Sequence, residues 1–506
     1  MRDKAVMDSY ALGQKLTAAG RLSEAIGAFE RALAEKPDDI RALFALGNTA
    51  RALGMGAAAE QFYRHVLELE PGRLEAVVNL ANLLRSQGAF EAAAALIRPA
   101  LAQKPDDPEL LLTLGSILRE TDALTAAADL YRAVLEKKPA SVPALVNLAD
   151  LLADGGNDRE ALKLYDRALK LEPDNAQARL NRAILHLARG NLKDGWKDYT
   201  ARLKVPGKVP LADHGLKRWD GSSLKRTRLL ITAEQGVGDH LMFASMIPEL
   251  AVRAAAEGGA LLLECEPRLR PLFVRSFPDV ATHDWDIEKR EGVLRTHYGW
   301  LKLAGGANAF MEMGSLPKLL RKTIAAFPAP NTFLTADPDE AARWRSCFEN
   351  LPRPWVAVCW RSGSTGGARA VQYAALKDWG GMLCEMPGTA IVAQYDARED
   401  ETAALSTLGG RPVFVPQEID QKQELDRVAA MLSVCDAVIS APTAVSWLSA
   451  GLGVPTFKAL YDLSWPSFGT NYEPFAPAAR CLMPARPGDW SDVMAQALAA
   501  IKALPA

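Results

Sequence analysis

The sequence of 506 residues lacks the cysteine and histidine patterns that build disulfide frameworks or zinc sites. Its six cysteines all lie in the second half of the chain, and no two of them form a Cys-x-x-Cys pair. This spacing argues against a disulfide framework or a zinc ribbon, and it favours a reducing compartment. The six histidines show no paired spacing either, so we expect no metal site.

An excess of one charge and a long apolar run are absent as well. The 59 lysines and arginines nearly balance the 61 aspartates and glutamates, which argues against binding nucleic acid through bulk electrostatics. No apolar run approaches the roughly 18 residues of a membrane span, and the first residues lack the apolar core of a signal peptide. We therefore expect a cytoplasmic protein without stable membrane insertion.

Tryptophan is missing from the first 195 residues, which are instead rich in alanine and leucine. In this segment five prolines are each 34 residues apart: Pro37, Pro71, Pro105, Pro139 and Pro173. They define five repeats of equal length, residues 6–39, 40–73, 74–107, 108–141 and 142–175. A proline at the end of each repeat stops a helix before the next repeat begins.

Four further positions recur within these repeats. The seventh is leucine (Leu12, Leu46, Leu80, Leu114, Leu148) and the eighth is small (Gly13, Gly47, Ala81, Gly115, Ala149). The twentieth is alanine (Ala25, Ala59, Ala93, Ala127, Ala161) and the twenty-fourth is large and apolar (Phe29, Tyr63, Ile97, Tyr131, Tyr165). Small residues let two helices approach while large ones fill the groove between them. The pattern resembles the tetratricopeptide repeat, which implies an all-α solenoid.

A degenerate sixth repeat follows from residue 176 to about 203, and it is predicted to cap the solenoid. We expect the concave surface to hold a polypeptide, the acceptor substrate if the chain is an enzyme. Three asparagines, Asn79, Asn147 and Asn181, occupy the sixth position of their repeats and could bind an extended peptide backbone. This ladder resembles the one in the superhelix of O-GlcNAc transferase. Alternatively these are tolerated surface residues, because Ala45 and Thr113 interrupt the series.

Residues 204–227 carry Pro, Gly and Lys without periodicity and are predicted to be a linker. Beyond them short apolar runs alternate with helical patterns, which indicates α/β domains with doubly wound parallel sheets. We place these domains at 228–335 and 336–506. The expected strands are 228–233, 260–266, 355–360, 389–395, 412–415, 437–440 and 455–460, and the main helices are 240–256, 423–433 and 444–452.

The first candidate site is the turn after the strand 228–233. Gly236 and Gly238 could allow positive φ and close approach of a ligand at the carboxyl end of a strand. Asp239 is either the N-cap of the following helix or a general base that activates an acceptor hydroxyl. His240 is a second possible base.

The second candidate site is Ser440 to Val445, where an apolar strand runs into a helix. Pro442 is expected as the first helical residue, so the backbone N–H groups of Thr443 and Ala444 would point outward and attract an anion. A phosphate group of an activated sugar would suit this site. The alternative is an ordinary helix capped by Ser440.

The third candidate site follows the strand 355–360. Arg361 and Arg369, with Ser362 and Gly363 between them, suit the recognition of phosphate through a planar fork of donors. Lys458 could add a charge to the same cleft. A glycine-rich surface loop and a solvated lysine are the alternatives. The Asp284-Trp285-Asp286 segment has the form of a metal-binding Asp-x-Asp motif, but it lies in an irregular stretch and is assigned to a loop.

Together these motifs resemble a GT-B glycosyltransferase of the heptosyltransferase and O-GlcNAc transferase kind, fused to tetratricopeptide repeats. The segments that carry the resemblance are 234–239, 359–363, 440–455 and 486–490. The pattern is most similar to bacterial flagellin glycosyltransferases. The fold class implied is an all-α solenoid followed by a pair of Rossmann-like doubly wound domains, the first on the acceptor side and the second on the nucleotide-sugar side.

The resemblance also implies a chemistry. Asp239 matches the general base of heptosyltransferases, and Ser440 to Val445 match the helix that binds the donor phosphate. No tightly bound cofactor is implied; the donor would be a CMP-, UDP- or ADP-linked sugar, and flagellin the acceptor protein. The chain departs from the pattern at Pro442 and Trp447. Either a changed donor, such as a CMP-linked nonulosonic acid, or a protein-binding scaffold with an inactive transferase domain would explain this.

Overall fold

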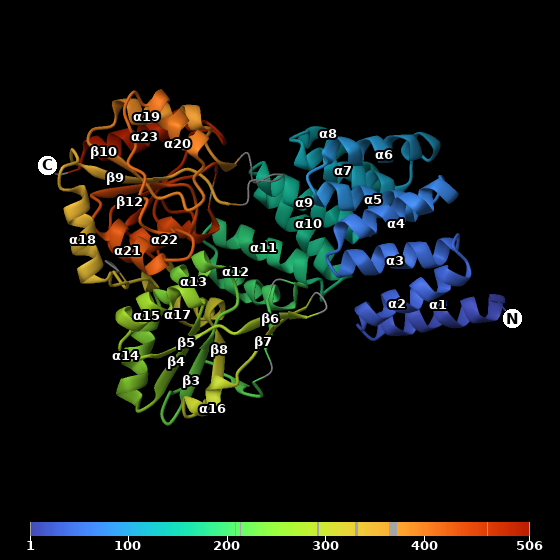
Figure 1. Cartoon of the computed structure of the whole chain (residues 1–506), viewed down its shortest axis with the longest axis horizontal. Helices are drawn as coiled ribbons and strands as arrows, with labels where there is room; N and C mark the ends of the chain where they lie inside the picture. The colour runs from blue at the N-terminus through green and yellow to red at the C-terminus, as the bar shows by residue number, and fades with distance from the viewer. Residues whose placement is uncertain are drawn as a thin grey trace. The chain divides into compact units, whose positions relative to one another are not determined.

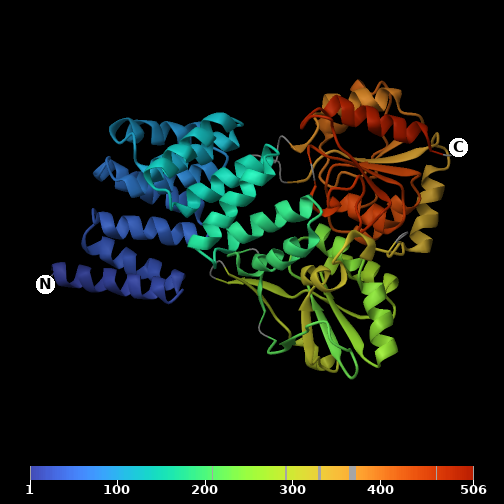
Figure 2. The ribbon, with the colours of Figure 1, turned by 180° about the vertical axis from the view of Figure 1, so that it is seen from behind.

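The computed structural model describes residues 2–207, 209–212, 214–290, 293–328, 332–363, 372–462 and 464–504. Its contacts divide the chain into two compact units (Figures 1 and 2). The first comprises residues 1–178 and 288–295, and the second comprises residues 179–287 and 296–506.

The first unit is built from antiparallel helix pairs. Its helices are α1 (Arg2–Ala18), α2 (Leu22–Glu35), α3 (Ile40–Ala52), α4 (Gly56–Leu69), α5 (Leu74–Ser86), α6 (Phe90–Gln103), α7 (Pro108–Glu120), α8 (Leu124–Lys137), α9 (Val142–Asp154) and α10 (Asp158–Leu171). From α3 onward the first helix of every pair begins 34 residues after the previous one. The all-α solenoid predicted from the proline spacing is confirmed.

The pairs pack as the repeat pattern requires. Tyr63 and Tyr131 are buried, and their rings lie against Gly47 and Gly115, where an added Cβ atom would come within 2.6 Å of the ring. In the third repeat Ala81 faces the smaller Ile97 in the same core cluster. Leu12 is the exception to the buried seventh position, being 43% exposed.

The second unit contains two five-stranded parallel sheets. The first has the order β2-β8-β3-β4-β5 and the second β10-β9-β11-β12-β13. Their strands are β2 (Lys217–Arg218), β3 (Arg228–Thr232), β4 (Ala260–Cys265), β5 (Ala281–Asp284), β8 (Ala309–Glu312), β9 (Trp355–Cys359), β10 (Thr389–Val392), β11 (Ala437–Ser440), β12 (Thr456–Ala459) and β13 (Ala479–Leu482). Short strands β1 (Leu211–Ala212), β6 (Ile287–Arg290) and β7 (Val293–Thr296) lie outside these sheets. The predicted α/β class with parallel sheets is confirmed.

Helices cover both faces of each sheet. They are α13 (Val237–Ala244), α14 (Ile247–Glu257), α15 (Arg270–Ser276), α16 (Trp300–Leu303), α17 (Pro317–Leu320), α18 (Pro338–Phe348), α19 (Leu376–Glu385), α20 (Glu399–Leu408), α21 (Leu425–Ser433), α22 (Ala444–Gly451) and α23 (Trp490–Lys502). One hydrophobic cluster runs continuously from the α13 to α15 side of the first sheet to the α18, α21 and α22 side of the second. The two sheets therefore share a core, and that core fixes where their strand ends meet.

Several elements differ from the prediction. The segment 412–415 forms an isolated bridge between Phe414 and Ile391 and no strand. The helix expected over 240–256 is two helices, α13 and α14. The segment expected to be a linker contributes β2 to the edge of the first sheet. The strands β2, β5, β8 and β13 were not predicted from the sequence, because each contains exposed or half-buried residues that interrupt or shorten its apolar run.

The predicted capping repeat packs on the second unit. It consists of α11 (Ala176–Ala188), α12 (Leu192–Tyr199) and the 3-10 helix Thr200–Lys204. Trp196 of α12 is buried against the rings of Trp465, Phe468 and Phe475, and its indole N–H donates to the Arg321 carbonyl oxygen at 2.9 Å. This packing explains why the boundary between the units falls inside α11, where the sequence predicted it near residue 203.

None of the helices in the described ranges is long and apolar enough to span a bilayer.

The contact between Gly47 and Tyr63 predicts a difference between two glycine substitutions. We expect Gly47→Ala to destabilise α3 and α4 by about 1–3 kcal/mol, because the added methyl group overpacks the ring. Gly72→Ala is the control, since nothing lies within 4 Å of a Cβ atom there. Hydrogen exchange should therefore become faster in α3 and α4 of the first variant only; equal protection in both variants would contradict the packing argument.

Candidate functional site

The structure brings the first two candidate sites together. Helix α13 follows β3 and helix α22 follows β11, and the two helices are in contact. They meet at Gly238, where an added Cβ atom would lie 3.6 Å from Cδ1 of Trp447 and 3.8 Å from Cα of Ala444. The glycine-rich turn of one sheet therefore lies against the first turn of a helix from the other sheet.

The two glycines do not have the conformation that the sequence suggested. Neither Gly236 nor Gly238 has positive φ; Gly236 is extended, with φ −76° and ψ 170°, and it is the N-cap of α13. Any residue can adopt that backbone conformation. The expectation of positive φ is wrong, and what Gly238 provides is space for the close approach of α22.

Asp239 is the third residue of α13 and is half-buried. The N-cap interpretation is wrong, because Gly236 occupies that position. A carboxylate in the first turn is stabilised by the positive end of the helix dipole. Burial raises the pKa of the Tyr199 hydroxyl, and the negative charge of Asp239 raises it further.

Tyr199 is a site residue that the sequence placed only in the capping repeat. Its ring is buried and lies 5.4 Å from that of Trp465, and its hydroxyl lies 3.4 Å from the side-chain amide of Gln235. Burial is the main reason that its pKa is raised above its usual value, so the hydroxyl stays protonated. Helix α12 thus delivers a hydrogen-bonding group to the turn that carries Asp239.

His240 does not face the same site. It is 1% exposed, its Nδ1 accepts the Glu266 N–H at 3.2 Å, and its ring lies 5.3 Å from that of Trp285. Burial lowers the pKa of His240 to about 4, so the ring is neutral and its basic nitrogen is already occupied. This geometry contradicts the predicted role as a base.

Glu234, at the start of the glycine-rich motif, has a structural role. It is buried and forms an ion pair with Arg202 at 2.6 Å, and it accepts the Gly314 N–H at 2.7 Å. An added Cβ atom at Gly314 would lie 2.6 Å from the Glu234 carboxylate. The pair therefore needs a glycine from the 3-10 helix Met313–Ser315, a requirement with no local signature in the sequence.

The N-terminus of α22 differs in detail from the prediction. The helix begins at Ala444 with Thr443 as its N-cap, so Pro442 lies before the helix and is not its first residue. The Thr443 N–H is not free, because it donates to the Ala441 carbonyl oxygen at 2.7 Å. The N–H groups without an intrahelical acceptor are those of Ala444, Val445 and the next residue.

Ser440 and Thr443 belong to a buried hydrogen-bonded group. The hydroxyl of Ser440 lies 3.2 Å from that of Thr443, and Cys359 Sγ lies 3.5 Å from the Thr443 hydroxyl. Ser440 is fully buried and does not cap the helix. Both side chains therefore stabilise the turn from inside the protein. The buried Ser440 hydroxyl is not accessible to a ligand.

Arg361 is held by two carboxylates. Its guanidinium pairs with Asp396 at 2.8 Å and with Glu401 at 2.7 Å, and it also donates to the Asp396 backbone oxygen. The main-chain N–H of Arg361 donates to the side chain of Gln394, which organises this strand exit. The planar fork is engaged within the protein, which speaks against the predicted recognition of phosphate by this side chain.

The neighbouring loop is described only in part. The Ser362 hydroxyl accepts from the Tyr373 hydroxyl at 2.9 Å, and the Gly363 N–H donates to the Tyr395 hydroxyl. Both residues therefore lie on the exit from β9, as expected. Arg369, which was also predicted to bind phosphate, lies outside the described residues.

Lys458 is also paired. It is 2% exposed, lies 2.5 Å from the carboxylate of Glu473, and sits 4.5 Å above the ring of Trp447. Its positive charge is thus neutralised by Glu473 inside the domain of the second sheet. Lys458 therefore does not face the cleft, contrary to the prediction. The pair instead supports Trp447, the residue that contacts Gly238.

The predicted asparagine ladder is partly engaged within the solenoid. Asn79 is half-buried and its Nδ2 donates to Oδ1 of Asn48 at 2.9 Å, which also accepts the Tyr63 hydroxyl at 2.7 Å. Asn147 on α9 and Asn181 on α11 are likewise half-buried. The first member therefore braces neighbouring repeats, while Asn147 is the better candidate for peptide contact.

Glu264 is a buried carboxyl group that the sequence did not indicate. It lies at the end of β4 with no exposed surface, and its Oε2 accepts the Ala233 N–H at 3.0 Å. Burial raises the pKa of Glu264 to about 8, so the group is largely protonated at neutral pH. It anchors the start of the glycine-rich turn from within the sheet.

Among the described residues no group of three or more His, Cys, Asp or Glu side chains is arranged to hold a metal ion.

Comparisons with known proteins define the class of the first half. Tetratricopeptide repeat models match residues 16–64, 78–142 and 146–200. This segment therefore consists of tetratricopeptide repeats.

The most informative relative is Protein FlbA of Caulobacter vibrioides, which is 34% identical over 303 residues, or 60% of this chain and 49% of that protein. The chain thus spans about half the length of this relative. Because the match is longer than the repeat segment, it extends into the α/β part.

Solved structures similar to this chain include tetratricopeptide repeat proteins. A thermophilic member from Thermus thermophilus is 26% identical, with 36% of this chain and all of that chain covered and a TM-score of 0.33. YrrB, described as having an unusual peptide-binding site, is 20% identical, with 35% and 95% covered and a TM-score of 0.29. PilF of Pseudomonas aeruginosa is 20% identical, with 41% and 94% covered and a TM-score of 0.33.

The contact between α13 and α22 predicts a size limit at position 238. Gly238→Ala should change the free energy of unfolding by no more than about 0.5 kcal/mol, because the added Cβ atom meets its neighbours at ordinary distances. Gly238→Leu should cost about 1–3 kcal/mol, because its longer side chain overlaps Trp447. Thermal unfolding of both variants would check this, and equal stability would contradict the contact.

The raised pKa of Glu264 predicts a pH dependence. The folded protein keeps this proton up to about pH 8, whereas the unfolded chain releases it near 4.5, so stability falls as pH rises between these values. The slope is at most about 1.4 kcal/mol per pH unit. Glu264→Gln should remove this contribution, and its advantage over wild type should grow up to pH 8 and then level off.

The control for this measurement is Glu385→Gln, because Glu385 is 66% exposed. Urea unfolding at a series of pH values should give this variant the wild-type slope. A wild-type slope in Glu264→Gln as well would contradict the assignment of a buried, protonated carboxyl group.

Proposed function

We propose that this chain is a cytoplasmic, metal-independent protein O-glycosyltransferase of the GT-B kind. Its repeats would hold the acceptor protein, and its α/β unit would bind a nucleotide sugar. The sugar would be transferred to a serine or threonine hydroxyl. Flagellin is the proposed acceptor, and a CMP-linked nonulosonic acid is among the proposed donors.

The observation that carries this proposal is the contact between the first turns of α13 and α22. Asp239 lies in the first turn of α13, and the adjacent Gly238 is packed against Ala444 in the first turn of α22. The Asp239 carboxylate and the positive N-terminal end of α22 are thereby close enough for bound reactants to contact both. These are the groups that an acceptor hydroxyl and a donor phosphate need.

In the proposed reaction Asp239 accepts the proton of the acceptor hydroxyl as its oxygen attacks the anomeric carbon. The bond from that carbon to the phosphate oxygen breaks, and the leaving phosphate is stabilised by the N–H groups of Ala444 and Val445. Holding both reactants in place can supply about 7–11 kcal/mol of the barrier reduction. The paired side chains of Arg361 and Lys458 would shape the site without touching the phosphate.

Two observations support a flagellar acceptor. The motifs at 234–239 and 359–363 resemble those of flagellin glycosyltransferases. The match to Protein FlbA covers 303 residues, more than the repeat segment, and so includes residues of the α/β part. A cell that produces this chain and flagellin together should therefore yield modified flagellin.

The proposal is tested by incubating the purified chain with flagellin and single nucleotide sugars, and by weighing the flagellin in a mass spectrometer. We expect a mass increase equal to one or more sugar residues with one class of donor. No increase with any CMP-, UDP- or ADP-linked sugar would reject the proposal.

The role of Asp239 predicts the effect of one substitution. Asp239→Asn should lower the transfer rate by about 10²–10⁴-fold, because an amide cannot accept the proton of the acceptor. Asp279→Asn, at an exposed position before β5, is the control and should keep the wild-type rate. If Asp239→Asn kept the wild-type rate, a residue other than Asp239 would be the general base.

A specific observation favours an alternative function, a protein-binding scaffold with an inactive transferase domain. Two of the three predicted phosphate-binding cations, Arg361 and Lys458, are paired inside the protein, and the backbone of α13 lies against the start of α22. The scaffold predicts that Asp239→Asn and Arg361→Ala leave the cellular phenotype unchanged, whereas Asn147→Ala abolishes it. The transferase predicts loss with Asp239→Asn.

A further inference from the structure

The turn that carries Asp239 has no side-chain cap of its own. Gly236 is the N-cap of α13, and it forms no side-chain hydrogen bond to the helix. The Asp239 N–H donates to the Gly236 carbonyl oxygen at 2.9 Å, so the place of Asp239 follows that of the residues just before it. Contacts from other elements must therefore fix the start of α13.

Arg202 supplies such a contact from the 3-10 helix Thr200–Lys204. Its Nε donates to Oε2 of Glu234 at 3.1 Å and its Nη2 donates to Oε1 at 2.6 Å, so the guanidinium holds the carboxylate through two parallel bonds. Its Nη1 donates to the Tyr199 carbonyl oxygen at 3.2 Å. The guanidinium is thereby fixed on both sides.

The carboxylate of Glu234 connects this guanidinium to the first sheet. Oε1 also accepts the Gly314 N–H at 2.7 Å. The Ser315 hydroxyl accepts from the same guanidinium at 2.8 Å and from Nη2 of Arg218 at 3.1 Å. Arg218 in turn pairs with Glu312 at the end of β8. The network thus joins the ends of β2 and β8 to the second residue after β3.

A second contact reaches the next residue of the turn. The hydroxyl of Tyr199, the last residue of α12, lies 3.4 Å from the side-chain amide of Gln235. The guanidinium of Arg202 lies 4.7 Å from the centre of the Tyr199 ring. Two successive residues of the turn are therefore held by two residues of the predicted capping repeat.

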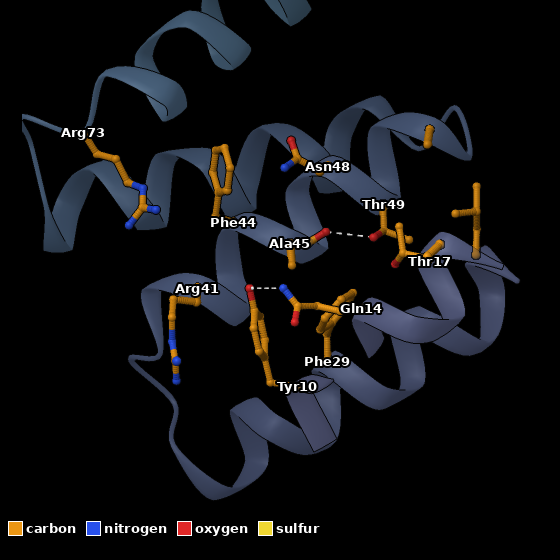
Figure 3. A pocket seen from close by; sticks show the side chains of 13 residues that line it. Tyr10, Gln14, Thr17, Phe29, Arg41, Phe44, Ala45, Asn48, Thr49 and Arg73 are labelled. Carbon is orange, nitrogen blue, oxygen red and sulfur yellow. Dashed lines mark hydrogen bonds between the residues drawn. The ribbon is translucent and has the colours of Figure 1, made fainter. Parts of the chain in front are cut away.

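The ion pair at the turn differs in burial from those of the solenoid. Arg41 and Arg73, at the hollow drawn in Figure 3, pair with carboxylates at the surface. One side chain of each pair is about half exposed, 49% for Arg41 and 50% for Glu70, and solvent weakens such pairs. The two side chains of the pair at the turn are only 3% and 2% exposed, so loss of either one leaves a buried charge without its partner.

From this geometry we propose that Arg202 and Glu234 are positioning residues for Asp239. The pair holds the start of α13, so that the first turn of this helix stays against α22 and the Asp239 carboxylate stays where an acceptor hydroxyl would be activated. This inference rests on the proposed function for the role of Asp239. It adds that the predicted capping repeat takes part in the transferase site.

The pair also determines the charge beside the turn. Burial raises the pKa of the Tyr199 hydroxyl, the positive charge of Arg202 lowers it, and the negative charges of Asp239 and Glu234 raise it. Glu234→Gln breaks the pair and leaves the positive charge, whereas Arg202→Gln breaks the same pair and removes that charge. A general loosening of the turn would be the same in both variants, while their electrostatic effects on Asp239 are opposite.

The first measurement is hydrogen exchange of the full chain without donor or acceptor. Glu234→Gln and Arg202→Gln should each speed exchange of residues 236–244 by about tenfold or more, because a buried group loses its ionic partner. The matched control is Glu249→Gln, since Glu249 pairs with the buried Arg321 at 2.7 Å but lies on α14. Circular dichroism establishes that each variant is folded.

The second measurement is the titration of the Asp239 carboxyl group, followed by NMR of the full chain labelled with carbon-13 in its aspartate side chains. Asp239→Asn identifies the signal. Glu234→Gln should lower the pKa of Asp239 and Arg202→Gln should raise it, whereas Glu249→Gln should leave it unchanged. In a chain that transfers sugar, the acid limb of the pH–rate profile should move in the same directions.

Arg202→Lys replaces a neutral variant that fails to fold. It keeps the charge but loses the parallel bonds, so exchange of residues 236–244 should become faster while the Asp239 titration stays as in wild type.

The proposal is overturned if exchange of residues 236–244 keeps the wild-type rate in the folded variants, if Glu249→Gln speeds it as much, or if both neutral variants move the Asp239 titration in one direction. Neither measurement needs a sugar donor. Failure here therefore leaves the transferase proposal open, and failure of sugar transfer leaves the anchoring of α13 by this pair standing.

Discussion

The contact of α22 with α13 is the interaction on which the second unit depends. Trp447 lies between Gly238 on one side and Lys458 on the other, and Lys458 is itself fixed by the buried carboxylate of Glu473. Loss of one partner from a buried ion pair leaves an uncompensated charge and costs about 3–5 kcal/mol. The position of Trp447, and with it the distance between the two sheets at their strand ends, is therefore strongly determined.

A second set of buried contacts attaches the last repeat to this unit. Trp196 is packed among the rings of Trp465, Phe468 and Phe475, and α12 continues directly to Tyr199. Tyr199 in turn reaches Gln235 in the glycine-rich turn. The predicted capping repeat thus supplies one wall of the candidate site.

Within the solenoid a fixed period is combined with local variation. The glycines at position eight face aromatic rings at position twenty-four, and Ala81 faces Ile97. The fifth repeat departs from this covariation, because it combines Ala149 with Tyr165. Position five varies independently, and its aromatic residues occur only in the first two repeats. The shared positions set the packing of helix on helix, whereas the variable ones give the inner surface its local chemistry.

The sequence by itself determined the repeats, their boundaries and the parallel α/β class. A 34-residue period and apolar strand runs are local patterns, and each corresponds directly to a helix pair or a buried strand in the structure. It also placed Asp239 and Ala444 near strand ends. Only the tertiary structure decided which predicted groups are available. Arg361, Lys458 and His240 are polar residues whose partners lie far away in the chain, so their pairing or burial has no local signature. The same is true of Tyr199 and Glu264, which enter the site through contacts between elements that no spacing in the sequence connects.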